Sequence, residues 1–328
     1  MRTKVTLSIV LPCHNEQEVI VDTVNTLTTL LLKWESTLIS DYEIVMVNNG
    51  STDNTLTKMR ELQSKDDRLV VVDLRRNYGY QGSISAGLFT AKNDVVVTID
   101  ADLQDDPNKI GEMLQKYYEG YDLVLGVRAR RKTDSFLKRT TANLYYWLQR
   151  KLGVESVPNH GDFRLLSREL VEELKRFPER NRYLRGMILQ LESKYGIVYY
   201  ERRKRKAGKS KFGIGPLFSL AFDGITSFTN VPLRFILLFG FLMFLLSILG
   251  IAFISYVRFG LNIDVPGWAF ISLAIMIFGG IQSLFLGILG EYIAKSYFEV
   301  KQRPIYLVRK IYKKDTFDTN LSFKHNKK

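Results

Sequence analysis

The chain has 328 residues, of which 47 are basic and 34 acidic, giving a formal net charge of +13. Residues 1–201 carry 28 side chains of each sign, whereas residues 202–328 carry 19 basic and 6 acidic ones. A neutral part followed by a basic part argues against nucleic-acid binding along the chain and favours an anionic membrane surface. The single cysteine, Cys13, excludes a disulfide within the chain and is typical of a reducing compartment.

Strands and helices are expected to alternate through the first part of the chain, because β-branched runs alternate with helical apolar spacing. Strands are expected at residues 6–11, 42–47, 69–73, 94–99, 123–127, 161–166 and 197–200. Helices are expected at residues 17–33, 54–64, 83–91, 108–119 and 136–152. The pattern predicts an α/β fold: a mostly parallel sheet with helices on both faces, whose polar loops gather at one edge.

The run of residues 94–99 (DVVVTI) ends abruptly in carboxylates. Asp100 and Asp102 lie two residues apart, so both can point toward one Mg²⁺ or Mn²⁺ ion, and Gln104 adds a carbonyl oxygen. Such hard ions take oxygen ligands and share them with substrate phosphates. The alternative is a strand end followed by an Asp-rich helix cap, because Pro107 suits a first helical turn.

Two long uncharged runs predict a membrane hairpin. Residues 235–257 are 23 residues without a charge, and residues 265–290 are 26. About 20 helical residues cross the apolar core of a bilayer. The loop 258–264 has one basic residue, whereas the flanks 202–211 and 295–328 have seven and ten, so both ends of the hairpin are expected in the cytoplasm.

These patterns divide the chain into four parts. They are an α/β domain over residues 1–212, an amphipathic juxtamembrane helix over 213–231, two transmembrane helices over 232–294 and a basic cytoplasmic tail over 295–328. The predicted location is the cytoplasmic (inner) membrane, crossed more than once, with the α/β domain in the cytoplasm.

Seven short motifs, taken together and in order, resemble a known enzyme family. Residues 11–16 (LPCHNE), 48–53 (NNGSTD), 76–79 (RNYG) and 100–104 (DADLQ) resemble the inverting GT-A glycosyltransferases of family 2. Residues 161–164 (GDFR), 205–212 (RKAGKSKF) and 289–293 (LGEYI) are similar to the polyprenyl-phosphate branch of that family. That branch includes dolichol-phosphate mannosyltransferase and the bacterial bactoprenol glucosyltransferases, and the resemblance extends over about residues 5–310.

The resemblance implies a GT-A fold, a nucleotide-sugar donor, a divalent metal and a lipid phosphate acceptor. It implies a nucleotide site made by Pro12, Asn15, Glu16, Asn49, Asp53, Gln81 and Asp100. It implies that Mg²⁺ or Mn²⁺ and the donor diphosphate are held by Asp100, Asp102 and Gln104. Helix capping is the alternative role of Asn15 and Glu16, and for Asp53 capping is compatible with nucleotide binding.

One position departs from the family pattern. The family usually has an acid where this chain has Asn49, which follows Asn48. An amide both donates and accepts hydrogen bonds, whereas a carboxylate only accepts them. The departure therefore bears on how the nucleobase is recognised.

A lipid phosphate acceptor would account for the lack of an evident catalytic base. The histidines are His14, His160 and His325, and none lies in a clear triad. A sugar hydroxyl would need a general base, but a phosphate monoester has a second pKa of about 6 and is mostly dianionic near neutral pH. The enzyme must instead hold two anions together and neutralise the departing diphosphate, which a metal and arginines can do.

Several polar groups are candidates for this work. Asp102, Asp162 and Arg128 are assigned to catalysis, and Arg139, Arg205, Ser210 and Lys211 are assigned to the acceptor phosphate. The alternative for each arginine is a surface ion pair, and the alternative for the basic run 202–211 is a topology signal. Asp162 could orient the acceptor, act as a base or pair with Arg164.

The leading functional prediction is transfer of one hexose, glucose from UDP-glucose, onto undecaprenyl or another polyprenyl phosphate. UDP-N-acetylglucosamine and GDP-mannose are the alternative donors. A flippase could then carry the lipid-linked sugar outward, and a homo-oligomer is left open. A processive polysaccharide synthase would have more membrane helices and a Gln-x-x-Arg-Trp motif, which this sequence lacks. A non-catalytic membrane scaffold is the third class, and the intact Asp100, Asp102 and Gln104 argue against it.

Overall fold

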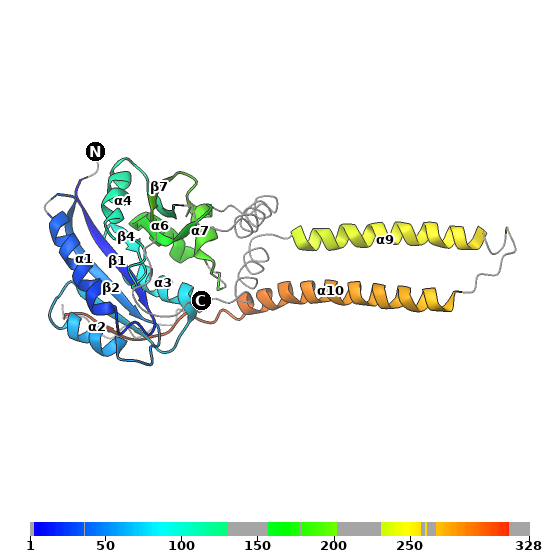
Figure 1. The fold of residues 1–328 in the computed structure, drawn as a ribbon, viewed down its shortest axis with the longest axis horizontal. Coiled ribbons are helices and arrows are strands. Elements are labelled where there is room, and N and C mark those ends of the chain that lie inside the picture. Colours follow the sequence, from blue (N-terminus) through cyan, green and yellow to red (C-terminus); the bar gives the residue numbers. More distant parts are fainter. Residues whose placement is uncertain are drawn as a thin grey trace, which may run out of the picture.

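A sheet between two layers of helices forms one part of the molecule, and two long helices project from it (Figure 1). The structure is a computed structural model that describes residues 3–35, 37–129, 157–177, 179–180, 182–201, 231–256, 260 and 267–314. Within these residues, eight strands make one sheet in the order β7-β5-β6-β4-β1-β2-β3-β8.

The sheet combines parallel and antiparallel strands. They are β1 (Val5–Cys13), β2 (Ile39–Asn48), β3 (Leu69–Leu74), β4 (Val95–Thr98), β5 (Leu123–Arg128), β6 (His160–Ser167), β7 (Tyr195–Tyr200) and β8 (Val308–Tyr312). β1 is parallel to β2 and β4, β2 is parallel to β3, and β5 is parallel to β7. β6 runs antiparallel to β4 and β5, and β8 runs antiparallel to β3. The central parallel strands are buried on both faces, which explains their β-branched runs.

Helices cover both faces of this sheet. Those of the globular part are α1 (Ile20–Glu35), α2 (Thr55–Gln63), α3 (Gly79–Thr90), α4 (Lys109–Tyr118), α6 (Arg168–Arg176) and α7 (Leu184–Leu191). Ile9 of β1 packs in the core layer that contains α1, α2 and α4, whereas the next residue, Val10, packs in the layer that contains α3, α6 and α7. Successive strand side chains point to opposite faces, so one strand supplies both layers. The predicted α/β fold is confirmed.

Most expected elements are present with shifted bounds, and three others were not expected. α3 begins at Gly79, four residues before the expected start. α6, α7 and β8 were not foreseen. For α6 the sequence held a local signal, because Ser167 caps this helix by accepting a hydrogen bond from the Leu170 N–H. The helix expected over residues 136–152 and the amphipathic helix expected over 213–231 lie outside the described residues.

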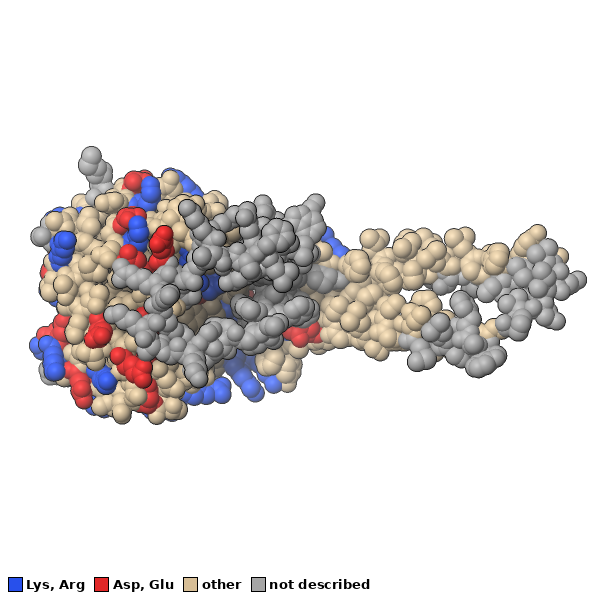
Figure 2. All heavy atoms as spheres, viewed as in Figure 1, with Lys and Arg blue, Asp and Glu red and all other residues tan. Residues whose placement is uncertain are grey.

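The two projecting helices are α9 (Val231–Ser255) and α10 (Trp268–Val300). By length and composition, Leu233–Gly250 and Ile277–Val300 could each cross a membrane. The rings of Phe239 and Phe285 meet edge to face at 5.5 Å, so the helices lie side by side, as in Figure 1. Among the described residues of the projecting part, those beyond its base show no charged side chain on the face seen in Figure 2.

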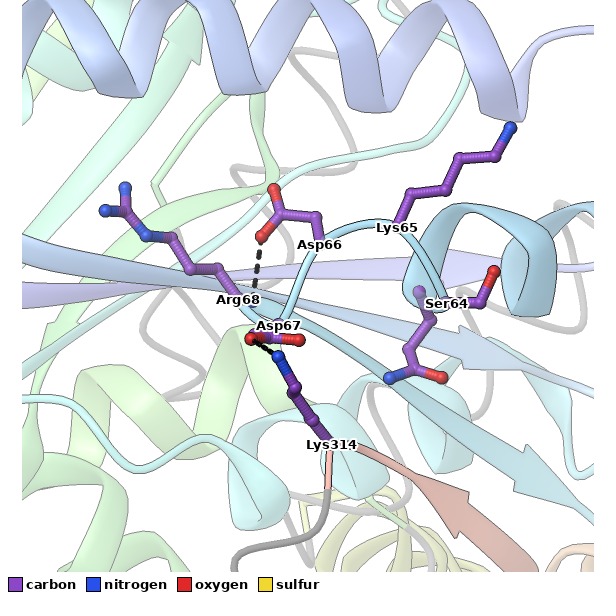
Figure 3. Close-up of a pocket in the computed structure, with 7 residues that line it drawn as sticks. Ser64, Lys65, Asp66, Asp67, Arg68 and Lys314 are labelled. Atoms are coloured by element: carbon purple, nitrogen blue, oxygen red, sulfur yellow. Dashed lines mark hydrogen bonds and ion pairs between the residues drawn. The ribbon is translucent and has the colours of Figure 1, made fainter.

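The segment after α10 returns to the sheet, although residues 295–328 were expected to be a tail. Residues 295–300 continue α10, and β8 then forms the sheet edge beside β3. Arg309 pairs with the buried Asp73 of β3 at 3.6 Å. Lys314, just beyond β8, pairs with Asp67 just before β3 (Figure 3). This part of the chain therefore completes the globular fold.

Candidate active site

A cavity of about 480 Å³ opens where β1, β2 and β4 end. Parallel strands end at the same edge of a sheet, so the loops that follow them meet there. Eight residues named from the sequence line this cavity: Pro12, Glu16, Asn49, Gln81, Asp100, Asp102, Arg128 and Asp162. The expectation that the polar loops gather at one edge is confirmed.

The carboxylate loop after β4 is held by hydrogen bonds at both ends. The Tyr80 hydroxyl donates to Asp100 Oδ1 at 2.5 Å. The backbone N–H of Gln104 donates to Asp102 Oδ1 at 3.1 Å. Leu103, between Asp102 and Gln104, has a left-handed backbone with φ +50°. The tight turn keeps Asp100 and Asp102 together at the cavity, whereas Gln104 does not line it.

The excess of carboxylates around Asp100 suits a cation. Burial raises the pKa of Asp100 to about 6, to which the charges of Asp105, Asp162 and Asp102 contribute against the opposing hydrogen bond from Tyr80. A cation would relieve this repulsion. In the described part of the chain, no group of three or more His, Cys, Asp or Glu is placed to hold a metal ion. An ion held by Asp100 and Asp102 would therefore share oxygen ligands with a substrate or water.

The loops after β1 and β2 are tied to each other by two polar side chains. Asn15 has φ +57°, and its Oδ1 accepts a hydrogen bond from the Thr52 N–H at 2.8 Å. Asp53 accepts from the N–H of Gln17 at 3.3 Å and of Thr55 at 3.0 Å. Burial alone would raise the pKa of Asp53, but the hydrogen bonds outweigh it and lower that pKa. Asn15 and Asp53 thus shape the loops and do not line the cavity.

Asn49, which follows β2, lines the cavity and also holds the loop before α3. Its Nδ2 donates to Asn77 Oδ1 and to the Gly79 carbonyl, both at 3.1 Å. Its Oδ1 accepts from the Tyr78 N–H at 2.9 Å. The amide therefore uses donor and acceptor capacity together, which a carboxylate at this position could not do.

A buried charge cluster surrounds Asp162 on β6. Asp162 is 6% exposed, and it pairs with the fully buried Arg164 and with Arg185 of α7, the latter at 2.7 Å. Burial alone would raise the pKa of Asp162, but the two arginines outweigh it and lower that pKa. A carboxylate held ionised in this way is a weak proton acceptor. Of the three expected roles, the arrangement favours the ion pair.

Arg128, at the end of β5, is also held in place. Its Nε donates to the Tyr200 hydroxyl at 3.1 Å and lies 3.9 Å from Asp105 Oδ1. Burial alone would lower the pKa of Arg128, but Tyr200 and Asp105 raise it above its ordinary value. Asp105 is 1% exposed and contributes a buried negative charge beside Arg128.

The four residues assigned to the acceptor phosphate lie outside the described residues. They are Arg139, Arg205, Ser210 and Lys211.

The cavity residues to which the sequence reasoning gave no role include Tyr80, Tyr183 and Arg185. Tyr80 is adjacent to Gln81, which was named, so its position in the glycine-bearing loop was the available signal. Arg185 is a charged residue inside the apolar stretch Leu184–Leu191, which indicates a buried partner. Its partner, Asp162, could be found only from the fold.

The family follows from the sequence profile of Glycosyl transferase family 2, which matches residues 8–175. The chain belongs to glycosyltransferase family 2. The uncharacterized glycosyltransferase YkoT of Bacillus subtilis (strain 168) is 42% identical over 307 residues, 92% of this chain and 90% of the relative. The bactoprenol glucosyl transferase of Shigella phage SfII is 37% identical over 305 residues, 93% of this chain and 97% of the relative.

Among solved structures, this family 2 glycosyltransferase is similar to glucosyl-3-phosphoglycerate synthase from Mycobacterium tuberculosis. That structure contains Mn²⁺, UDP-glucose and phosphoglyceric acid. The similarity covers 68% of this chain and 78% of the other, with 19% identity and a TM-score of 0.43.

The cavity of this family 2 glycosyltransferase presents charges of both signs. Asp100 and Asp102 form an acidic pair at the end of β4, while Arg128 and Arg185 add two guanidinium groups. Guanidinium groups bind phosphate oxygens through paired N–H groups. Preorganised charges of this kind stabilise negative charge as it develops on a leaving group. The arrangement can therefore bind a diphosphate and assist its departure.

Proposed function

We propose that this enzyme transfers one glucose from UDP-glucose, with inversion, onto undecaprenyl or another polyprenyl phosphate. The observation that carries the proposal is the cavity itself, where an acidic pair and two arginines meet at the sheet edge. The bactoprenol glucosyl transferase of Shigella phage SfII, similar over 93% of this chain, supports the choice of sugar and acceptor.

Asp100 and Asp102 are the proposed ligands of Mg²⁺ or Mn²⁺, and Gln104 is proposed to support them, because its backbone N–H holds Asp102. A bound ion would neutralise charge on the donor diphosphate. Burial first, and then the neighbouring carboxylates, raise the pKa of Asp100, and this crowding of negative charge supports a cation at this position. Pro12, Glu16, Asn49 and Gln81, which line the cavity, are the proposed surroundings of the nucleotide. Asn15 and Asp53 are proposed to shape the loops that carry them.

The acceptor phosphate is proposed to attack without a general base. An oxygen of the dianionic phosphate forms the bond to the anomeric carbon, the bond from that carbon to the donor diphosphate breaks, and no proton is transferred. Arg128 and Arg185 orient the two phosphate groups and offset their repulsion. Asp162 holds Arg185 by accepting its hydrogen bond at 2.7 Å. Asp162 is therefore proposed as a positioning group.

The reaction is proposed to occur at the cytoplasmic face of the cell membrane. α9 and α10 are the proposed multi-pass anchor, and their basic flanks support a cytoplasmic catalytic domain. A polyprenyl tail stays in the bilayer, so its phosphate would reach the protein near Arg139, Arg205, Ser210 and Lys211. A homo-oligomer and a flippase acting on the product are further parts of this proposal.

The test is a transfer assay with purified protein in detergent. Undecaprenyl phosphate is supplied with radiolabelled UDP-glucose, UDP-N-acetylglucosamine or GDP-mannose, each with Mn²⁺ and with EDTA. A lipid-linked single glucose is expected with UDP-glucose, and EDTA or Asp102→Asn should abolish its formation. A polymer product would instead identify a processive synthase, and no transfer from any donor would contradict an enzymatic role.

The acceptor assignment has its own comparison. Arg205→Ala and Lys211→Ala should raise the KM for polyprenyl phosphate and leave the Kd for UDP unchanged. Unchanged acceptor kinetics in both variants, with normal membrane insertion, would mean that the basic run sets topology alone.

A further inference from the structure

The loop before α3 is fixed by a closed network of hydrogen bonds centred on Asn49. The Tyr78 N–H donates to Oδ1 of Asn49, so the other amide atom must be Nδ2, which donates to Asn77 Oδ1 and to the Gly79 carbonyl. Asn77 Oδ1 also accepts from the Gly79 N–H at 2.8 Å. Both backbone polar groups of Gly79 are therefore held, one by Asn49 and one by Asn77.

His14 connects the same network to the end of β1. Its Nδ1 lies 3.0 Å from the Asn49 carbonyl, which can only accept, so Nδ1 carries the hydrogen. Nε2 is then the acceptor for Asn77 Nδ2 at 3.3 Å. The loops after β1, β2 and β3 are joined through three side chains: His14, Asn49 and Asn77.

Gly79 is the point where this network meets the carboxylate site. It has φ +75°, a left-handed backbone that glycine adopts readily, and it begins α3. The next residue, Tyr80, donates its hydroxyl hydrogen to Asp100 Oδ1 at 2.5 Å. Fixing the peptide groups of Gly79 fixes the direction in which the Tyr80 side chain leaves the backbone. The hydrogen bonds thus run from Asn49 through Gly79 and Tyr80 to Asp100.

We propose that Asn49 is a positioning residue for the carboxylate of Asp100, acting through Gly79 and Tyr80, and that it does not select the nucleobase. The inference rests on the proposed function, in which Asp100 holds the metal. It also gives a reason for the departure from the family acid. An aspartate at this position would present an acceptor to Asn77 Oδ1 and to the Gly79 carbonyl, which are acceptors themselves.

The test is Mn²⁺ binding by the full-length protein in detergent with UDP, measured from the electron paramagnetic resonance signal of free Mn²⁺. Removing a group that orients a metal ligand typically lowers metal affinity about 10- to 100-fold. Asn49→Ala and Tyr80→Phe should each lower Mn²⁺ affinity about tenfold. The double variant should bind Mn²⁺ with the same affinity as the single variant that binds it less tightly, because both changes break the same chain of contacts. Additive losses would overturn the proposal.

A second readout needs no metal. In metal-free protein, hydrogen exchange of the Tyr78 and Gly79 amides should be faster in Asn49→Ala than in the wild type. Asn77→Ala should behave in the same way, and it replaces Asn49→Ala if that variant fails to fold. Asn54→Ala is the matched control, because Asn54 is exposed and makes no capping hydrogen bond through its side chain. Unchanged exchange in a folded Asn49→Ala protein would overturn the proposal.

The base-selection alternative is tested by metal-free binding of UDP and CDP. The ratio of the two affinities should be the same in the wild type and in Asn49→Ala. A changed ratio with unchanged Mn²⁺ affinity would assign Asn49 to the nucleobase and overturn the proposal.

Asp102→Asn separates a failure of the proposed metal site from a failure of the proposed role of Asn49. If it binds Mn²⁺ as the wild type does, the metal site of the proposed function fails. If it loses Mn²⁺ and Asn49→Ala does not, only the inference about Asn49 fails.

Discussion

The carboxylate of Asp162 lies between two guanidinium groups with almost no access to water. Its partner Arg164 is fully buried and belongs to the same strand, whereas Arg185 comes from α7 and reaches the cavity. Burial disfavours every charge in this cluster, so each ion depends on its partners. A single substitution there should affect folding as well as chemistry.

Asp162→Asn should destabilise the protein by about 3–5 kcal/mol, because it leaves Arg164 buried without a counter-charge. The free energy of unfolding in detergent, from urea titration, measures this. Glu172→Gln is the matched control, because Glu172 pairs with Lys175 at the surface and such pairs contribute about 0–1 kcal/mol. Equal stability of the two variants would contradict the picture of a buried ionic cluster.

His160 should make the protein less stable in mild acid. It is 8% exposed, and its pKa is lowered to about 3. Burial is the main cause, and the charges of Arg164, Arg185 and Arg128 add to it against the opposing charge of Asp162. In the unfolded chain its pKa is about 6.5, so between these values the unfolded state binds a proton that the folded state does not. Stability is therefore lost as the pH falls through this window, by about 2 kcal/mol at pH 5.

The measurement for His160 is urea unfolding at pH 7 and pH 5. The wild type should lose more stability between these pH values than His160→Gln, which has no group to titrate. Parallel losses in the two proteins would mean that His160 is not buried in its neutral form.

At the scale of elements, α3 depends on close contact with the sheet. A Cβ placed on Gly87 would lie 2.2 Å from Val10 Cγ1 and 3.0 Å from Val47 Cγ2, on two central strands. A larger residue would push the helix outward, and the first turn of α3 carries Tyr80 and Gln81 into the cavity. The absence of a side chain at Gly87 therefore sets the distance between the sheet and the wall of the site that α3 forms.

Two helix glycines should respond to alanine in opposite ways. Gly87→Ala should destabilise the protein by about 1–3 kcal/mol, because overpacking displaces α3. Gly111→Ala in α4 should be neutral or stabilise by about 0.5–1 kcal/mol, because its Cβ would make ordinary contact with Trp34 at 3.4 Å and alanine favours helix. Unfolding midpoints of the two variants measure this difference. Destabilisation of the same size in both would show that α3 is not packed as described.

The elements that the sequence predicted correctly are those with strong local patterns. β1, β2 and β4 are buried on both faces, so their β-branched runs stand out, and the loops that follow them carried most of the site residues. α7 has no such pattern, because most of its residues are buried around its circumference. The early start of α3 is supported by a hydrogen bond from Asn49, which is 30 residues before Gly79 and belongs to another loop. Contacts between distant segments, including the pair of Asp162 with Arg185, could not be derived from local spacing.

At the scale of the whole molecule, the pairing of β3 with β8 constrains the membrane topology proposed above. β3 precedes both long helices and β8 follows them, yet the two strands are neighbours in one sheet. Strands on opposite sides of a bilayer cannot share hydrogen bonds. In the topology proposed above, the chain between them therefore crosses the membrane an even number of times, in agreement with the distribution of basic residues.

Accessibility from the two sides of the membrane tests this path. Single cysteines are placed at Glu61, in α2, and at Lys313, just after β8. Both should react with an impermeant maleimide in inside-out vesicles, and neither should react in right-side-out vesicles. Cys13 is 1% exposed and should not interfere. Opposite accessibility of the two positions would mean that one helix alone crosses the membrane.

The position of β8 also has a consequence for how the protein is made. Until α9 and α10 have left the ribosome, β3 remains an open strand edge, and such edges pair readily with other chains. A nascent chain that inserted its hairpin with one crossing too few would carry residues 308–312 to the wrong compartment, and the sheet would stay unfinished. In the topology proposed above, completion of the sheet would act as a check on membrane insertion, and misinserted copies would be the ones exposed to aggregation and proteolysis.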